Sequence, residues 1–218
     1  MSLSIDQFIQ IINEESALII DTRPAIDWID GHIPRSLHIT PATVKFAVAM
    51  GLINKDSSIA LVIDEQFKRE TLAYFKEANF SNVLGYLQGG FDQWKVSGQK
   101  IDLVIEVEAD ELAMDIPYDE YLMPLDIRAE ELFDNGHIKN SVSIPLVEFM
   151  DPGSFSELDE HFNIYIISED GLSNTLAASI LKKEGIHNFR MVQGGWESVM
   201  LIKEKFTIES NKKKISEE

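Results

Sequence analysis

Short apolar runs alternate along the chain with stretches whose apolar residues recur every three or four positions, and the whole alternation occurs twice. Continuous β-branched runs are typical of strands covered on both faces, and the wider spacing is typical of amphipathic helices. The predicted strands are 17–21, 36–39, 59–64 and 82–87, then 121–126, 141–144, 163–168 and 189–193. The predicted helices are 5–14, 41–51, 69–78 and 173–184. This order favours an α/β fold in which helices cover both faces of a parallel β-sheet.

Three short motifs occur twice at a constant separation. They are Asp21-x-Arg23, Gly31-His32-Ile33 and Gly89-Gly90-Phe91, which recur 105 residues later as Asp126-x-Arg128, Gly136-His137-Ile138 and Gly194-Gly195-Trp196. A register kept over three separated motifs indicates an internal duplication. We therefore expect two domains, 1–100 and 101–203, each long enough to bury its own core. The charged tail, 204–218, is expected to fray.

Composition excludes several classes of function. The chain contains no cysteine, so disulfides, cysteine metal sites and thiol mechanisms are all excluded. The net charge of −18 argues against nucleic acids and anionic membrane surfaces as partners, because both require a basic surface. Residues 1–100 carry 9 basic and 12 acidic side chains, whereas 101–218 carry 10 and 25. The acidic excess is interpreted either as a solubilising surface or as a docking face for a basic partner.

Targeting and ligand signals are also weak. No apolar run reaches the length of a membrane span, and the N-terminal residues do not form a secretory signal, so we expect a cytoplasmic location. The acidic cluster at 102–115 lacks the spacing of a calcium-binding loop. Neither a metal nor a cofactor is expected.

The order, spacing and repetition of the three motifs resemble those of the rhodanese-like (sulfurtransferase) family over nearly the whole chain, twice. The resemblance implies two tandem rhodanese-like domains, as in thiosulfate and 3-mercaptopyruvate sulfurtransferases. It also implies a catalytic loop that a Cys opens and an Arg closes, between a strand and a helix. In such two-domain enzymes the N-terminal copy commonly lacks the Cys and the C-terminal copy reacts. Here the C-terminal copy lacks it too.

The two loops are located by aligning Thr71-Leu72-Ala73 with Thr175-Leu176-Ala177. The first loop is Asp64, Glu65, Gln66, Phe67, Lys68 and Arg69; the second is Ser168, Glu169, Asp170, Gly171, Leu172 and Ser173. By resemblance, Asp64 and Ser168 occupy the position of the persulfide-forming Cys. Neither a carboxylate nor a hydroxyl can carry a persulfide, and the neighbouring acids would repel an anionic donor. In the first loop Arg69 retains the Arg that closes the family's loop. In the second loop Ser173 stands at that position.

The remaining candidate residues favour structural roles. Asp64 is expected to accept hydrogen bonds from loop N–H groups at a helix N-terminus, and the amides of 66–69 and 170–173 are expected to point inward. Ser168 lacks the Gly-x-Ser-x-Gly elbow of serine hydrolases. Asp21 with Arg23, and Asp126 with Arg128, are expected to form ion pairs at strand ends. His32 and His137 are expected to bond to the backbone of their turns.

These observations predict a protein that is inactive by the sulfurtransferase mechanism. The preferred hypothesis is a binding, regulatory or scaffold module that engages a protein partner at the loop faces or at an interdomain cleft. The alternative is a thiosulfate sulfurtransferase-type enzyme that uses a thiol supplied by a partner or by a small molecule.

Overall fold

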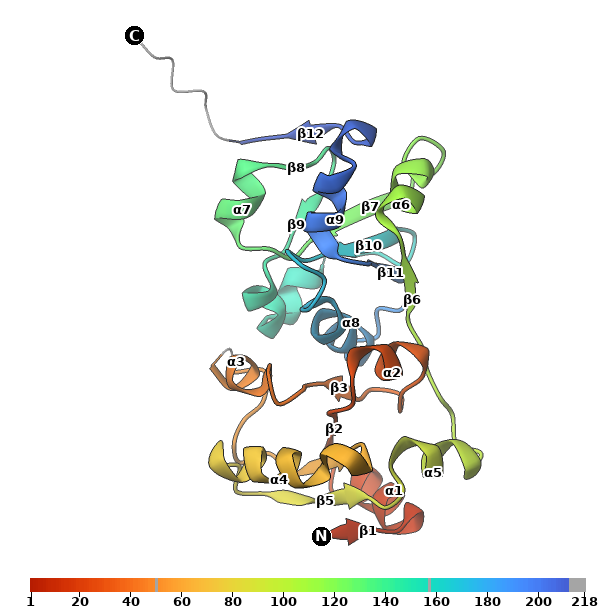
Figure 1. Ribbon diagram of the computed structural model, residues 1–218, viewed down its shortest axis with the longest axis vertical. Helices are drawn as coiled ribbons and strands as arrows, with labels where there is room; N and C mark the ends of the chain where they lie inside the picture. The colour runs from red at the N-terminus through yellow and green to blue at the C-terminus, as the bar shows by residue number, and fades with distance from the viewer. Residues whose placement is uncertain (50, 157, 212–218) are drawn as a thin grey trace. The chain divides into compact units, whose positions relative to one another are not determined.

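The computed structural model describes residues 1–49, 51–156 and 158–211 (Figure 1). The chain divides into two compact units between Leu103 and Val104, and each is described by itself. Within the described residues, no helix is both long enough and apolar enough to cross a membrane.

The N-terminal unit is a parallel five-stranded sheet with the strand order β1-β5-β4-β2-β3. Its strands are β1 (Ser2–Leu3), β2 (Leu18–Asp21), β3 (Leu37–His38), β4 (Ile59–Val62) and β5 (Val83–Leu87). Its helices are α1 (Ile5–Glu14), α2 (Ala25–Asp30), α3 (Val44–Ala49), α4 (Lys68–Glu77) and α5 (Gly90–Val96), and the short 3₁₀ helix η1 (Glu65–Phe67) precedes α4.

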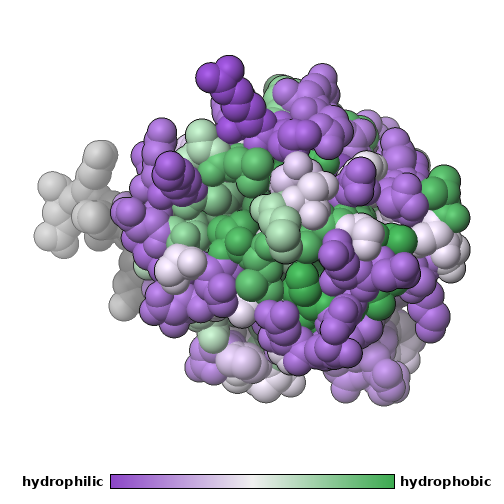
Figure 2. Space-filling view, turned by 90° about the horizontal axis from the view of Figure 1, so that it is seen from below, coloured by the Kyte–Doolittle hydropathy of each residue, from purple (hydrophilic) through white to green (hydrophobic). Residues whose placement is uncertain are grey.

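Both faces of this sheet are covered. Ala60 and Val62 of β4 pack in one apolar cluster with Phe8 of α1 and Trp94 of α5. Leu61, which alternates with them and therefore points to the opposite face, is also fully buried. Figure 2, which views the protein from the end where β1 and α1 lie, shows apolar surface surrounded by hydrophilic side chains.

The C-terminal unit repeats the topology, with the order β6-β11-β10-β7-β9. Its strands are β6 (Ile105–Val107), β7 (Leu122–Asp126), β9 (Val142–Ser143), β10 (Asn163–Ile167) and β11 (Phe189–Val192). Its helices are α6 (Ala109–Asp115), α7 (Glu130–Asn135), α8 (Asn174–Lys183) and α9 (Gly195–Leu201), with 3₁₀ helices η2 (Leu146–Met150), η3 (Pro152–Phe155) and η4 (Lys203–Lys205). The predicted α/β class and the duplication are thereby confirmed.

All eight predicted strands overlap observed ones, but the helix predicted over 41–51 is shorter. α3 begins only at Val44 because residues 40–43 form a turn, in which the Thr40 N–H donates to Thr43 Oγ1 at 3.0 Å. Residue 50 lies outside the described residues. The short edge strands β1 and β6 were not predicted, because two or three residues give no measurable periodicity.

The expectation of a frayed tail is wrong for residues 204–211. β12 (Ile208–Glu209) pairs antiparallel with β8 (His137–Ile138), and the N–H of Lys139 donates to the carbonyl of Thr207 at 2.8 Å. The edge of β8 offers backbone groups that the tail satisfies, and Phe206 packs against the apolar cluster of this unit. The rest of the predicted tail, 212–218, lies outside the described residues.

Candidate functional site

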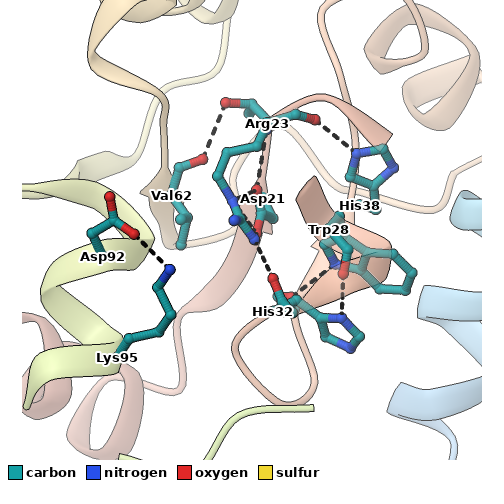
Figure 3. A network of polar contacts seen from close by, with 11 residues as sticks. Asp21, Arg23, Trp28, His32, His38, Val62, Asp92 and Lys95 are labelled. Carbon is teal, nitrogen blue, oxygen red and sulfur yellow. Dashed lines mark hydrogen bonds and ion pairs between the residues drawn. The ribbon is translucent and has the colours of Figure 1, made fainter. Parts of the chain in front are cut away.

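A buried ion pair marks the end of β2 in the first unit and of β7 in the second. Asp21, the last residue of β2, accepts hydrogen bonds from the backbone N–H of Arg23 and from its Nε and Nη2, the last at 2.7 Å (Figure 3). Asp126 and Arg128 repeat this arrangement after β7, also with Nη2 at 2.7 Å. These are the strand-end pairs that the sequence predicted.

The same guanidinium joins all three repeated motifs. Arg23 Nη2 also donates to the carbonyl of Gly31 at 2.7 Å, and Arg23 Cζ lies 4.1 Å from the centre of the Phe91 ring. In the second unit Arg128 contacts Gly136 at 2.7 Å and lies 3.9 Å from the ring centre of Trp196. The Asp-x-Arg, Gly-His-Ile and Gly-Gly-aromatic motifs therefore meet at one buried side chain in each domain.

The two motif histidines have structural contacts. His32 Nδ1 lies 2.8 Å from the carbonyl of Trp28, and its ring stacks on the Trp28 ring at 3.9 Å (Figure 3). His137 repeats both contacts with Phe133, at 2.9 and 3.8 Å. Sequence reasoning missed a third histidine, His38 at the end of β3, whose Nε2 lies 2.9 Å from the carbonyl of Arg23. Burial lowers the pKa of the His38 imidazole, which favours the neutral form of its ring.

The first loop is closed by its own first residue. Asp64 Oδ1 accepts the N–H of Gln66 at 3.0 Å, and the carbonyl of Asp64 accepts the N–H of Phe67 at 3.0 Å. The N–H of Lys68 donates to the carbonyl of Glu65, while the Glu65 carboxylate pairs with Lys68 Nζ at 2.5 Å. Asp64 thus caps η1 as the sequence predicted. The amides of Gln66, Phe67 and Lys68 are therefore used by the loop itself and are not left for an external anion.

The second loop is closed around Ser168, which is only 3% exposed. Its Oγ accepts the N–H of Gly171 at 2.9 Å, and its backbone N–H donates to Asn174 Oδ1 at 3.1 Å. Its carbonyl accepts the N–H of Trp196 at 2.7 Å, at the start of α9. The neighbouring Glu169 carboxylate lies 3.7 Å from Arg128 Nη1.

The other loop residues lie at the protein surface. The Asp170 carboxylate accepts the N–H of Leu172 at 2.9 Å, and Ser173 precedes α8 without a capping bond from its side chain. Arg69, the retained closing Arg, is exposed on α4. Asn174 was not among the predicted site residues, although it ties the loop to β11 through a 2.9 Å bond to the carbonyl of Val192.

A cavity of about 480 Å³ opens beside the first loop of the N-terminal unit. Its charged lining consists of five carboxylates and two basic side chains: Asp27, Asp30, Asp64, Glu65 and Asp92, with Arg23 and Lys95. Both basic groups are in ion pairs, Arg23 with Asp21 and Lys95 with Asp92, each at 2.7 Å (Figure 3). The cavity is therefore electronegative, which disfavours thiosulfate or any other anionic sulfur donor.

The sequence model of the rhodanese-like domain family matches this chain twice, over residues 4–97 and 108–201. The chain belongs to the rhodanese-like family. Its two rhodanese-like domains coincide with the duplicated motifs and the duplicated sheets.

Among curated proteins, this rhodanese-like chain is similar to the putative sulfur carrier protein YrkF of Bacillus subtilis, with 33% identity over 89 residues. The match covers 41% of this chain and 47% of that protein, so the chain spans about half the length of the curated relative it matches.

Within the described residues, no group of three or more His, Asp or Glu side chains is arranged to hold a metal ion.

Solved structures of the family are similar at low identity. Thiosulfate sulfurtransferase of Pseudomonas aeruginosa is 14% identical, with 97% of this chain and 44% of that chain covered and a TM-score of 0.43. The 3-mercaptopyruvate sulfurtransferase SseA of Escherichia coli is 16% identical, with 89% and 98% covered and a TM-score of 0.39. The rhodanese-like domain of the Anabaena protein Alr3790 is 20% identical, with 52% and 85% covered and a TM-score of 0.44.

Proposed function

We propose that this tandem rhodanese-like protein is a non-catalytic member of the sulfurtransferase family that acts as a binding or regulatory module. The observation that carries the proposal is the state of the two loops. At both positions assigned to the family Cys, an oxygen side chain, of Asp64 or Ser168, is bonded to the loop's own amides. The cytoplasmic location expected from the sequence stays a prediction.

The chemistry of sulfur transfer supports this proposal. A rhodanese loop holds sulfur as a persulfide, which requires a soft, polarisable thiolate that can bind a second sulfur and release it. The chain contains no cysteine at any of its 218 positions. The similar YrkF protein is described as a putative sulfur carrier, but the residues of this chain provide no thiol on which sulfur could be carried.

The loop surfaces support a protein partner. Phe67 on the first loop is 42% exposed and Leu172 on the second is 75% exposed, and each lies within a few residues of exposed acids. An apolar side chain among charged ones is the mixture found at the core and rim of transient interfaces. Each loop therefore offers a small recognition surface in place of a reactive centre.

The proposal is tested by assaying thiocyanate formation from cyanide, with thiosulfate and with mercaptopyruvate as donors. We expect no turnover above a heat-denatured sample, while a cysteine-containing sulfurtransferase assayed in parallel turns over. A second series with added glutathione or dithiothreitol tests the alternative in which the thiol is supplied from outside. Protein-dependent turnover without added thiol would overturn the proposal, and turnover only with added thiol would establish the alternative.

A further inference from the structure

The cavity beside Asp64 holds carboxylates that no basic side chain neutralises. Asp27, Asp30 and Asp64 all line it, and none forms an ion pair with a described residue. Asp27 and Asp30 are three residues apart on α2, so their like charges repel. Asp30 is the last residue of α2, where the helix dipole also disfavours an anion. The fold therefore keeps an unrelieved negative charge around this opening.

A second feature of the cavity is an open donor on a buried group. Arg23 is 7% exposed, and its Nε and Nη2 are used by Asp21 and Gly31. Its Nη1 has no acceptor among the described residues, although Arg23 lines the cavity.

The C-terminal unit shows what such a nitrogen can bind. There, the equivalent Nη1 of Arg128 lies 3.7 Å from a carboxylate oxygen of Glu169. In the first unit the matching residue, Glu65, pairs with Lys68 instead, and Arg23 is among the residues that line the cavity. The corresponding nitrogen thus lies within ion-pair distance of a carboxylate in one domain and has no such neighbour among the described residues in the other.

We propose that this cavity receives a lysine or arginine side chain of a partner protein, and that a main-chain carbonyl of the same segment accepts a hydrogen bond from Arg23 Nη1. The cationic head is attracted by Asp27, Asp30 and Asp64. A neutral carbonyl satisfies Arg23 without adding another anion beside five carboxylates. The volume of about 480 Å³ lies within the usual range of ligand pockets, roughly 300–1,000 Å³. This inference rests on the proposed function, because it specifies the partner of the same site.

The test uses the full chain and small probes followed by amide NMR. The probes are N-acetyl-lysine N-methylamide, its norleucine and glutamate counterparts, and n-butylammonium, which has the cation but no carbonyl. We expect the lysine probe to shift the amide signals of residues 63–66 and 89–92 in a saturable manner. Norleucine and glutamate amides should leave those signals unchanged, and n-butylammonium should bind more weakly than the lysine amide.

Two matched variants distinguish an effect of the cavity carboxylates on probe binding from an effect of the protein's overall charge. Asp27→Asn with Asp30→Asn should weaken binding of the lysine probe about threefold to tenfold, as expected for two partly exposed charge pairs. Glu14→Gln with Glu15→Gln removes the same charge at the end of α1, away from the cavity lining, and should leave the affinity unchanged. All four positions are exposed, so both variants should fold.

Three outcomes would overturn the inference: no saturable shift with the lysine probe, equal weakening in both variants, or stronger binding of the glutamate probe. Equal binding of n-butylammonium and the lysine amide would remove the role given to Arg23. None of these outcomes alters the thiocyanate assay, so a failure here is distinguishable from a failure of the proposed function.

Discussion

At the scale of single residues, the structure explains why the motifs survive although the reactive residue is absent. Arg23 and Arg128 each contact the carboxylate that ends β2 or β7, the carbonyl before the motif histidine and the ring that follows the two glycines. Breaking a buried pair of this kind by removing one partner costs about 3–5 kcal/mol. These motifs therefore maintain the fold, and their presence does not indicate catalysis.

The two family Cys positions differ in accessibility, and a thiol placed at each should report this. We predict that Ser168→Cys is alkylated by iodoacetamide at least about tenfold more slowly than Asp64→Cys in the folded protein, because Ser168 is 3% exposed whereas Asp64 lines an open cavity. Mass spectrometry of timed samples measures both rates, and the uncharged reagent avoids repulsion by the acids.

The control is the same reaction in urea, where the two thiols should react alike. If Ser168→Cys reacted as fast as Asp64→Cys in the native protein, the second loop would be open in solution, and the closed arrangement around Gly171 and Asn174 would be wrong.

At the scale of elements, the glycine pairs at the start of α5 and α9 allow each loop to lie close to the first turn of a helix. Gly194 and Gly195 have φ values of 69° and 56°, in the left-handed region that residues other than glycine rarely adopt. A Cβ at Gly195 would lie 2.3 Å from the carbonyl oxygen of Ser168. At Gly90 the corresponding distance to the carbonyl of Ile63 would be 2.9 Å. Close backbone contact, and not phosphate binding, accounts for these glycines.

Gly195→Ala tests this contact. We predict that it lowers the free energy of unfolding of the C-terminal unit by about 2–4 kcal/mol, because the new methyl group collides with backbone atoms of the loop. Gly98→Ala is the matched control: its φ is also positive, at 73°, but no atom lies within 4 Å of the added Cβ. The control should cost about 1–2 kcal/mol, the strain of a left-handed alanine.

Urea unfolding followed by hydrogen exchange assigns each loss to its unit. If both variants lost the same free energy of unfolding, backbone strain alone would account for the effect at Gly195. The Ser168 loop would then move away from the added methyl group without cost.

At the scale of the whole molecule, the two copies have kept their topology while their charges have diverged. The strand orders correspond one to one, yet residues 101–218 carry 25 acidic and 10 basic side chains, against 12 and 9 in residues 1–100. An excess of acidic over basic side chains makes the folded state repel itself, and salt screens this repulsion.

We therefore predict that salt stabilises the C-terminal unit more than the N-terminal unit. Raising NaCl from about 0.05 to 0.5 M shortens the screening length from about 14 to about 4 Å. The free energy of unfolding of the C-terminal unit in urea should rise on the order of 1 kcal/mol, and that of the N-terminal unit by less. Hydrogen exchange distinguishes the units, and an equal response of both would show that the acidic excess does not strain the second fold.

The sequence by itself determined the features that depend on local pattern and on chemistry. Apolar runs such as 59–64 and 163–168 were predicted as strands because burial on both faces leaves a continuous apolar signal, and both overlap observed strands. The constant separation of the motifs was sufficient to infer the duplication from the sequence. The absence of cysteine excluded a thiol mechanism whatever the fold, since no packing can supply a missing sulfur atom.

Only the tertiary structure decided which of these segments meet. Arg23 reaches Gly31 and Phe91 because parallel strands with helical crossovers bring the carboxyl ends of distant segments to one edge of the sheet. The pairing of β12 with β8, and the carboxylates of α2 beside Asp64, likewise join residues far apart in the chain. Such contacts leave no periodic trace in the sequence. They arise from loop closure and from the need to satisfy buried backbone and charged groups, which act only once the chain has folded.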